Sequence, residues 1–304
     1  MGEAKSEAPL DERGEMSEPR QTRAQHPAHQ GREELKHWRP DQRWYHPTIC
    51  SLVVSASRFV MSRMNQLSFE GRERWDALFG KDGEAWERQD GRGLLSFSNH
   101  VSLFDDPLLI SNLGATRYRD VRWIAADHVN FFGSNLKGMF FSGGKCVPLI
   151  RGGGLVQPGF DFLRERLLAG EWVHIFPEGG RSRRAEGRLQ LPFKVGVGRL
   201  ICEASPVVMP FFHYGMHRIQ PIGATLPRRG QEVKVRFGES TVIDEPWREA
   251  TLAGELDEQA QWRLATDWAE AQLLELERQT HPELSEGSAC DAAADINALE
   301  SDGE

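Results

Sequence analysis

Short apolar runs alternate with longer amphipathic stretches along most of the chain, and this alternation limits the possible folds more than any other feature. The apolar runs have the length and composition of buried strands, and they lie at 93–98, 121–126, 145–150, 171–176, 206–212 and 233–238. Helical spacing is found at 160–170, 193–204 and 256–279. Strands that alternate with helices predict an α/β fold in which helices cover a sheet.

The sequence between residues 45 and 278 has no internal repeat and no linker, so we expect it to form one domain. Residues 1–44 are rich in charges of both signs, and residues 279–304 are acidic and poor in large apolar side chains. Both tails have the composition of disordered chain. The stretch 281–304 holds seven acidic residues and no Lys or Arg, so it carries most of the net charge of −8. The acidic balance therefore indicates no particular partner, and we expect no nucleic acid to bind.

The cysteines and histidines lack the spacing of metal ligands. None of the cysteines forms a C-x-x-C pair; they are Cys50, Cys146, Cys202 and Cys290. The histidines considered as ligands share no common spacing; they are His128, His174, His213 and His217. We therefore expect neither a disulfide framework nor a metal site.

The segment Thr48–Leu67 is apolar, but it carries too many polar residues to cross a bilayer. Its polar positions recur at spacings of four and three, at Ser51, Ser55, Arg58, Ser62 and Asn65. The apolar positions fill the other face, at Ile49, Leu52, Val53, Ala56, Val60, Met64 and Leu67. This pattern predicts an amphipathic helix. Such a helix fits the plane of a membrane interface, and it equally fits packing against a protein core.

The stretch "SFSNHVSLFDDP", residues 96–107, places His100 and two aspartates directly after a predicted strand. Asp106 followed by Pro107 is typical of a helix start, with Asp106 as the N-cap and Gly114 as the end of the helix. His100 and Asp105 then share the turn before the helix. A histidine beside a carboxylate is suited to general base catalysis, although a purely structural histidine fits the spacing as well.

A second polar stretch, "FPEGGRSRR", follows the predicted strand at 171–176. Gly179 and Gly180 allow close approach to the main chain, and three arginines follow them. Arginine binds phosphate through two parallel hydrogen bonds, but a solvated basic loop has the same composition. Arg151 stands at another strand end, just before three glycines.

Several blocks together resemble the glycerolipid acyltransferase family. Its N-H-x4-D motif is present as Asn99, His100 and Asp105, its F-P-E-G-x-R-S block runs from Phe176 to Ser182, and its later apolar block with proline is present as Val207–Pro210. The longer stretches "SNHVSLFDDP", "FFSGGKCVPLIRGGG", "GEWVHIFPEG" and "FKVGVGRLICEASPVVMPFFHYGM" are similar to the tafazzin branch of the family. The similarity extends over residues 45–240.

The resemblance implies a single domain with a central mixed β-sheet covered by helices, and it implies acyl transfer between glycerophospholipids. His100 would take a proton from the acceptor hydroxyl, and Asp105 would orient and charge-balance that histidine. The residues implied to bind the substrate are Asn99, Arg151, Glu178, Gly179 and Arg181, with Lys194 as a further phosphate candidate. Glu178 is expected to position an arginine or a substrate hydroxyl. The resemblance implies no cofactor and no metal, and it does not identify the oxyanion donor.

The implied reaction is phospholipid–lysophospholipid transacylation that remodels cardiolipin. Tafazzins usually lack the R-S pair present here as Arg181 and Ser182, which are typical of the broader family. This departure keeps an alternative open, namely a lysophospholipid acyltransferase that depends on acyl-CoA.

A lipid substrate implies access to a membrane, so the resemblance favours an interfacial position for the helix at 48–67. The segment 129–141 is a second candidate for membrane contact. The apolar residues expected to meet the bilayer are Leu52, Val53, Val60, Phe131, Phe132, Phe140 and Phe141. The implied location is a mitochondrial membrane facing the intermembrane space, with another intracellular membrane as the alternative. The number of subunits is left open.

Overall fold

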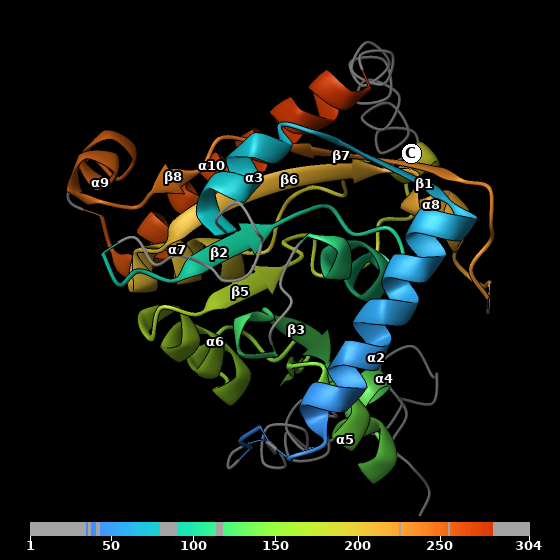
Figure 1. The fold of residues 1–304 in the computed structure, drawn as a ribbon. Helices are drawn as coiled ribbons and strands as arrows, with labels where there is room; N and C mark the ends of the chain where they lie inside the picture. The colour runs from blue at the N-terminus through green and yellow to red at the C-terminus, as the bar shows by residue number, and fades with distance from the viewer. Residues whose placement is uncertain are drawn as a thin grey trace, which may run out of the picture.

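The computed structural model describes residue 35 and residues 38–40, 43–79, 90–113, 118–224, 226–254 and 256–281. A sheet runs through the middle of the molecule, in the order β1-β7-β6-β2-β5-β3-β4, with β8 beside β6 (Figure 1). The predicted α/β class with a central mixed sheet and helical cover is confirmed. The tails predicted to be disordered, 1–44 and 279–304, lie almost entirely outside the described residues.

The centre of the sheet is parallel. Its strands are β2 (Leu94–Phe97), β3 (Trp123–Asp127), β4 (Cys146–Leu149), β5 (Trp172–Ile175) and β6 (Val207–Tyr214). β2 lies between β5 and β6 and is buried along its whole length. Because all five strands point the same way, the loops that follow them meet at one edge of the sheet.

The other part of the sheet makes it mixed. β7 (Glu232–Phe237) and β8 (Thr241–Val242) pair with β6 in the antiparallel direction, and β1 (Gln66–Glu70) pairs with β7 in parallel. β1 was not predicted. Its first two residues, Gln66 and Leu67, were assigned to the amphipathic helix, whereas the helix ends before them.

The predicted helix at 48–67 is observed as α2 (His46–Phe59), which continues as the π-helical segment η2 (Val60–Met64). Asn65 ends it, because its main chain is extended and its side chain bonds to the segments on both sides. The amide nitrogen of Asn65 donates to Val60 O at 3.2 Å, and its Oδ1 accepts from Gln231 N at 3.0 Å. The second bond joins the end of the helix to the start of β7.

Two apolar cores lie on the two faces of the sheet. On one face α3 (Arg72–Phe79) packs over β2, β6 and β7. On the other face the cover consists of α6 (Pro158–Leu168), α7 (Gly196–Ala204) and the long helix α10 (Glu258–Thr280). Figure 1 shows α3 in front of the sheet and α7 and α10 behind it. The short helix α9 (Glu245–Thr251) lies beside α10.

α2 runs along one side of the molecule, next to α4 (His128–Phe132) and α5 (Asn135–Gly143) (Figure 1). The segment 129–141, a candidate for membrane contact, thus falls on two helices, separated by Gly133 and Ser134. Cys50, Ser57 and the following Met61 are buried, whereas Leu52 and Phe59 are exposed. Among the described residues, none of the helices combines the length and the apolarity that a bilayer crossing requires.

Candidate active site

Polar residues from five chain segments meet where the parallel strands end. His100 follows β2, Arg151 follows β4 and Glu178 follows β5. Asp127 is the last residue of β3, and His213 lies near the end of β6. In open α/β sheets this edge is where ligands bind. The sheet topology thus brings together two motifs that are far apart in the sequence.

The turn after β2 is organised by the carboxylate of Asp105. Its Oδ2 accepts from the main-chain N–H groups of Val101 at 2.7 Å and Ser102 at 2.9 Å, and it lies 2.8 Å from Nδ1 of His100. Asp105 is fully buried. Burial alone would raise its pKa, but the nearby His213 and the hydrogen bond from His100 outweigh burial and hold the pKa below its ordinary value. An ionised Asp105 fixes the proton of His100 on Nδ1 and leaves Nε2 free to accept another.

The loop after β5 holds His100 from the other side. The His100 ring stacks on Phe176, with 4.1 Å between ring centroids and 12° between planes. The main-chain N–H of His100 donates to Glu178 Oε1 at 2.5 Å, and its carbonyl accepts from Ser182 N at 2.7 Å. The side chain of His100 remains 18% exposed. The ring is therefore fixed in position and still open to a substrate.

Glu178 has a different role from the one predicted. We expected it to position an arginine or a substrate hydroxyl, but both oxygens bind main-chain groups of the protein. Oε1 accepts from His100, and Oε2 accepts from Gln190 N at 2.7 Å. Burial raises the pKa of Glu178 to about 8, although the two main-chain donors act in the opposite direction. Glu178 thus joins its own loop to the turn that carries His100.

Asn99 is also used inside the protein. Its side chain is fully buried, its Nδ2 donates to His213 O at 2.9 Å, and its Oδ1 accepts from His213 N at 2.9 Å. These two hydrogen bonds, to the C=O and the N–H of His213, extend the pairing of β2 with β6. Asn99 was predicted to contact the substrate, and the structure places it as a support of the catalytic turn.

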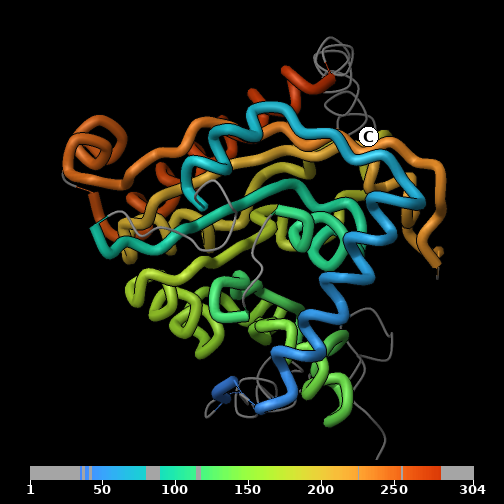
Figure 2. Tube along the Cα trace, in the orientation of Figure 1, coloured from blue at the N-terminus to red at the C-terminus, as the bar shows by residue number. Residues whose placement is uncertain are grey.

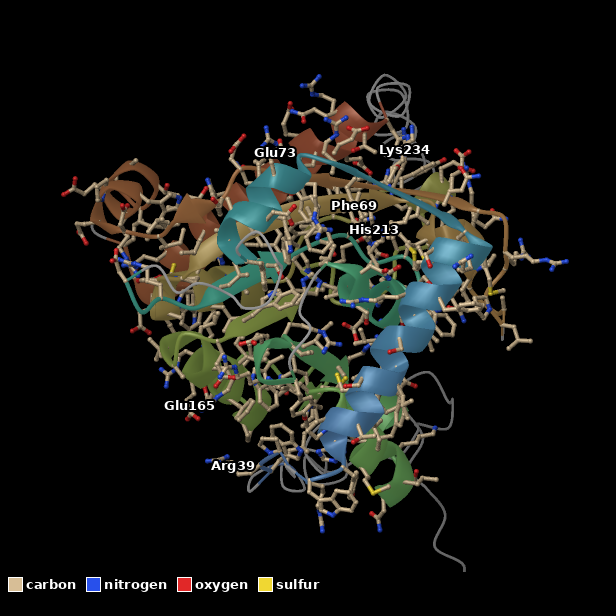
Figure 3. All side chains as sticks on the ribbon, viewed as in Figure 1. Arg39, Phe69, Glu73, Glu165, His213 and Lys234 are labelled. Atoms are coloured by element: carbon tan, nitrogen blue, oxygen red, sulfur yellow. The ribbon has the colours of Figure 1, made fainter. Side chains whose placement is uncertain are left out.

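His213 is a member of the site that the sequence analysis considered only as a metal ligand. Its Nε2 lies 3.0 Å from Asn99 O and 3.9 Å from Asp105 Oδ2. It lies in the interior of the molecule, where burial lowers its pKa (Figure 3). The available sequence signal was a histidine at the end of the apolar run "VVMPFFHYGM". Nothing local in that run indicates that Asp105 is its neighbour.

Three basic side chains surround the two glycines that follow Glu178. Arg151 is exposed and pairs with Asp127, with 2.6 Å between Nε and Oδ2. A side-chain carbon on Gly180 would lie 3.8 Å from Nη2 of Arg151, and one on Gly179 would lie 2.7 Å from the stem of Lys194. Gly179 therefore lets Lys194 approach the main chain, whereas Gly180 only lies in ordinary contact distance of Arg151. The third, the half-buried Arg181, follows Gly180 directly.

Asp106 does not cap a helix as predicted. The chain from Asp105 to Leu109 is a π-helical turn, η3, that begins after Phe104 and has no side-chain cap. Both oxygens of Asp106 instead bind the guanidinium of Arg122, which also donates to Gly144 O at 2.8 Å. The carboxylate of Asp106 thus bonds to an arginine 16 residues later in the chain and not to the main-chain N–H groups that follow it. Gly114, the predicted helix end, lies outside the described residues.

In the described part of the chain, no group of three or more His, Cys, Asp or Glu side chains is arranged to hold a metal ion. The ring of His174, one of the histidines considered as a ligand, faces two serines. Its Nδ1 lies 2.8 Å from Ser96 Oγ, and its Nε2 lies 3.4 Å from Ser98 Oγ. Burial lowers its pKa well below the ordinary value, so it is a neutral part of the sheet interior.

Comparison with known proteins assigns the region that carries this site. Residues 80–214 match the family model described as Acyltransferase. These residues belong to the acyltransferase family. The N-H-x4-D and F-P-E-G motifs both fall within the matched acyltransferase region.

Two tafazzins are among the relatives of the chain. It is 34% identical over 211 residues to the tafazzin of Drosophila melanogaster, covering 66% of this chain and 53% of the relative. It is 34% identical over 164 residues to the tafazzin of Dictyostelium discoideum, covering 51% of this chain and 56% of the relative. The chain thus spans about half the length of these curated relatives. The resemblance to the tafazzin branch is confirmed.

A plant protein and a solved structure extend the comparison. The chain is 29% identical over 207 residues to the N-acylphosphatidylethanolamine synthase of Arabidopsis thaliana, covering 64% of this chain and 71% of the relative. The crystal structure of the 1-acyl-sn-glycerophosphate acyltransferase of Thermotoga maritima superposes with a TM-score of 0.52 at 17% identity, covering 81% of this chain and 86% of that one. At that identity the likeness shows the fold alone.

The residues predicted to meet a membrane differ in exposure. Leu52 is 66% exposed and Phe140 is 45% exposed, whereas Val53 and Phe131 are half-buried. Three others pack against the core next to α3, namely Val60, Phe132 and Phe141. The same helices expose four large apolar side chains that the sequence analysis did not single out, namely Phe59, Val129, Leu136 and Met139. The helical spacing at 48–67 was predicted, but the sequence did not show which apolar side chains of these helices face solvent.

Proposed function

We propose that this protein is a phospholipid–lysophospholipid transacylase that moves fatty acyl chains between glycerophospholipids and remodels cardiolipin. The observation that carries the proposal is the His100–Asp105 pair, held rigidly at the strand ends with the His100 ring still accessible. The pair lies within the acyltransferase region, and two relatives are named tafazzin. The proposed substrates are glycerophospholipids and their lysophospholipids.

The proposed reaction uses one proton carrier. Nε2 of His100 takes the proton of the hydroxyl of a lysophospholipid, and the hydroxyl oxygen attacks the ester carbonyl of a donor phospholipid. The buried carboxylate of Asp105 stabilises the imidazolium that forms. The tetrahedral intermediate then expels the donor's glycerol oxygen, which recovers the proton from His100. One ester bond forms and one breaks, so neither an acyl-enzyme nor a cofactor is needed.

The basic side chains beside Gly179 and Gly180 are proposed to hold the lipid phosphate. Arg151 and Arg181 offer paired N–H donors, and Lys194 offers a point charge. Asp127 fixes the guanidinium of Arg151 through Nε, which leaves its outer nitrogens available to an anion. This arrangement would set the distance between the lipid phosphate and the hydroxyl that His100 deprotonates.

The protein is proposed to work at a mitochondrial membrane facing the intermembrane space, as a peripheral or monotopic protein, with another intracellular membrane as the alternative. The names of the tafazzin relatives support this proposal. The exposed side chains of Leu52, Phe59, Leu136 and Phe140 support contact with a bilayer, because α2 and α5 pack together and present them to solvent.

The alternative function is acyl transfer from acyl-CoA to a lysophospholipid. The R-S pair that favoured it is present, but Ser182 is buried and its Oγ donates to Arg188 O at 2.5 Å. Its main-chain N–H is the group that binds His100 O. Ser182 therefore supports the loop, and only Arg181 of the pair remains as a candidate for substrate contact.

The test is acyl transfer by purified protein in liposomes that contain labelled phosphatidylcholine, phosphatidylethanolamine and monolysocardiolipin, with and without CoA and acyl-CoA. Transfer without CoA supports the transacylase. Transfer only with acyl-CoA supports the alternative, and product on phosphatidylethanolamine nitrogen would indicate the activity that the Arabidopsis relative's name states. The His100→Ala variant is the control for adventitious transfer.

A further inference from the structure

The loop between α8 (Met216–Ile219) and β7 combines exposed apolar and basic side chains. Ile222 is 47% exposed and Leu226 is 77% exposed. Arg228 and Arg229 follow and are also exposed. The loop is closed at its base by Arg228 N, which donates to Ile219 O at 2.7 Å. Two large apolar side chains are therefore held on a short, closed segment in contact with water.

This α8–β7 loop is joined to the end of η2, the continuation of α2. Gly230 N donates to Met64 O at 2.7 Å, and Gln231 N donates to the side chain of Asn65. Phe59, which is 61% exposed, precedes Met64 by little more than one helical turn. Figures 1 and 2 show the loop beside this end of the helix. The loop that carries these apolar side chains is thus fixed beside the end of η2.

The charged residues of the loop itself, 220–231, are both arginines, and the acidic Glu232 follows at the start of β7. Arg63 on η2 is exposed like Arg228 and Arg229. Within the described residues none of these three arginines forms an ion pair. The loop and the end of η2 therefore combine exposed arginines with exposed apolar side chains. An anionic lipid surface meets both needs, since it attracts arginine and accepts apolar side chains. A second copy of the chain would place arginines against arginines.

The same loop contacts the catalytic turn through Gln220. Its Oε1 accepts from Ser102 Oγ at 3.1 Å, and its Nε2 donates to Ala224 O at 2.8 Å. Ser102 is one of the main-chain donors to Asp105. The side chain of Gln220 therefore links the loop that carries Ile222 and Leu226 to the turn that holds His100.

We infer that the α8–β7 loop is a second membrane contact, which docks beside α2 on a bilayer containing anionic phospholipid. The inference rests on the proposed function only in that the substrate is a lipid. It adds a contact distinct from α2, α4 and α5, and it assigns the charge of the lipid. With contacts at α2 and at the loop, the protein would meet the bilayer at two separate places.

The experiment is flotation of the full chain with vesicles of phosphatidylcholine alone or mixed with phosphatidylglycerol. Ile222→Asp/Leu226→Asp should lower partition to both vesicles by about tenfold or more. Arg228→Gln/Arg229→Gln should lower partition by about tenfold on the anionic vesicles only, and added salt should weaken this variant less than the wild type. The matched controls are Leu168→Asp on α6 and Arg39→Gln/Arg263→Gln, all at exposed positions away from the loop, and both should bind like the wild type.

The inference would be overturned if both loop variants bound the vesicles like the wild type. It would also be overturned if the wild type formed a dimer on gel filtration, the loop variants did not, and the variants bound the vesicles no more weakly. The apolar variant is paired with the arginine variant, so a folding defect in one leaves the other as the test. Acyl transfer to lysophospholipid dispersed in detergent separates this result from the proposed function. A loop variant that transfers normally in detergent but floats poorly would support both, whereas a wild type inactive in both settings would refute only the enzyme.

Discussion

The turn after β2 and the loop after β5 each direct a buried carboxyl group at the same histidine, but the pKa values of the two groups are shifted in opposite directions. Asp105 binds the ring of His100, and its pKa is lowered. Glu178 binds the main-chain N–H of His100, and burial raises its pKa to about 8. Both side chains are almost without solvent, so depth does not explain the difference.

The hydrogen-bond partners and neighbouring charges of Asp105 and Glu178 explain why their pKa values shift in opposite directions. Asp105 has two imidazoles near its Oδ2, whereas the oxygens of Glu178 accept hydrogen bonds from main-chain groups only. The charge of Asp105 itself also disfavours a second negative charge on Glu178. We propose that the carboxylate of Asp105 serves the chemistry of the His100 ring, and that the carboxyl group of Glu178 serves its position.

Removing the ring or its carboxylate should have the largest effect. His100→Ala and Asp105→Asn should each lower kcat by about a thousandfold, because the first removes the proton acceptor and the second no longer fixes its tautomer or stabilises its charge. Initial rates of acyl transfer measure the loss. Unchanged thermal melting would show that the fold survives. Turnover within a few-fold of the wild type in either variant would remove the pair from the mechanism.

Glu178→Gln should have an intermediate effect that reaches both rate and stability. One of its amide atoms must present N–H to a main-chain donor, which leaves a buried donor unsatisfied and costs about 1–3 kcal/mol of unfolding free energy. The resulting shift of His100 should lower kcat by about tenfold. Urea unfolding and initial rates measure the two effects.

Glu277→Gln is the matched control for that variant. Glu277 also accepts from a main-chain N–H, that of Leu189 at 2.8 Å, and burial also raises its pKa, but it makes no contact with His100. It should lose stability and keep its kcat. Equal losses of kcat in the two variants would contradict the positioning role of Glu178.

The smallest expected effect is a dependence of stability on pH that belongs to Glu178. Because the folded protein binds this proton more tightly than the unfolded chain, its contribution is complete below the ordinary pKa of 4.5 and is lost as the pH rises to about 8. Buried His174 and His213 have lowered pKa values, so their contribution has the opposite slope below 6.5. The difference in unfolding free energy between wild type and Glu178→Gln isolates the carboxyl. With rising pH the wild type should lose stability relative to the variant, and a constant difference would mean that the pKa of Glu178 is the same in the folded and unfolded states.

The strands of the parallel sheet and the motifs that follow them could be predicted from local sequence patterns. Apolar runs of strand length, separated by helical spacing, locate β2 to β6 because burial and periodicity are local properties of the chain. The family motifs likewise located His100, Asp105, Glu178 and Arg151. The chemistry of these side chains could be read before any contact between them was known.

The partners of these side chains could not be predicted in this way, because they depend on how distant segments pack together. Asn65 ends its helix through a residue 166 positions away, and Asp106 leaves the predicted cap for Arg122. Glu178 takes two main-chain donors, and His213 comes from β6 to lie beside Asp105. In each case a polar side chain interacts with a group that is distant in the sequence. A local pattern specifies that a polar group must be satisfied when it is buried, but it does not specify which distant group satisfies it.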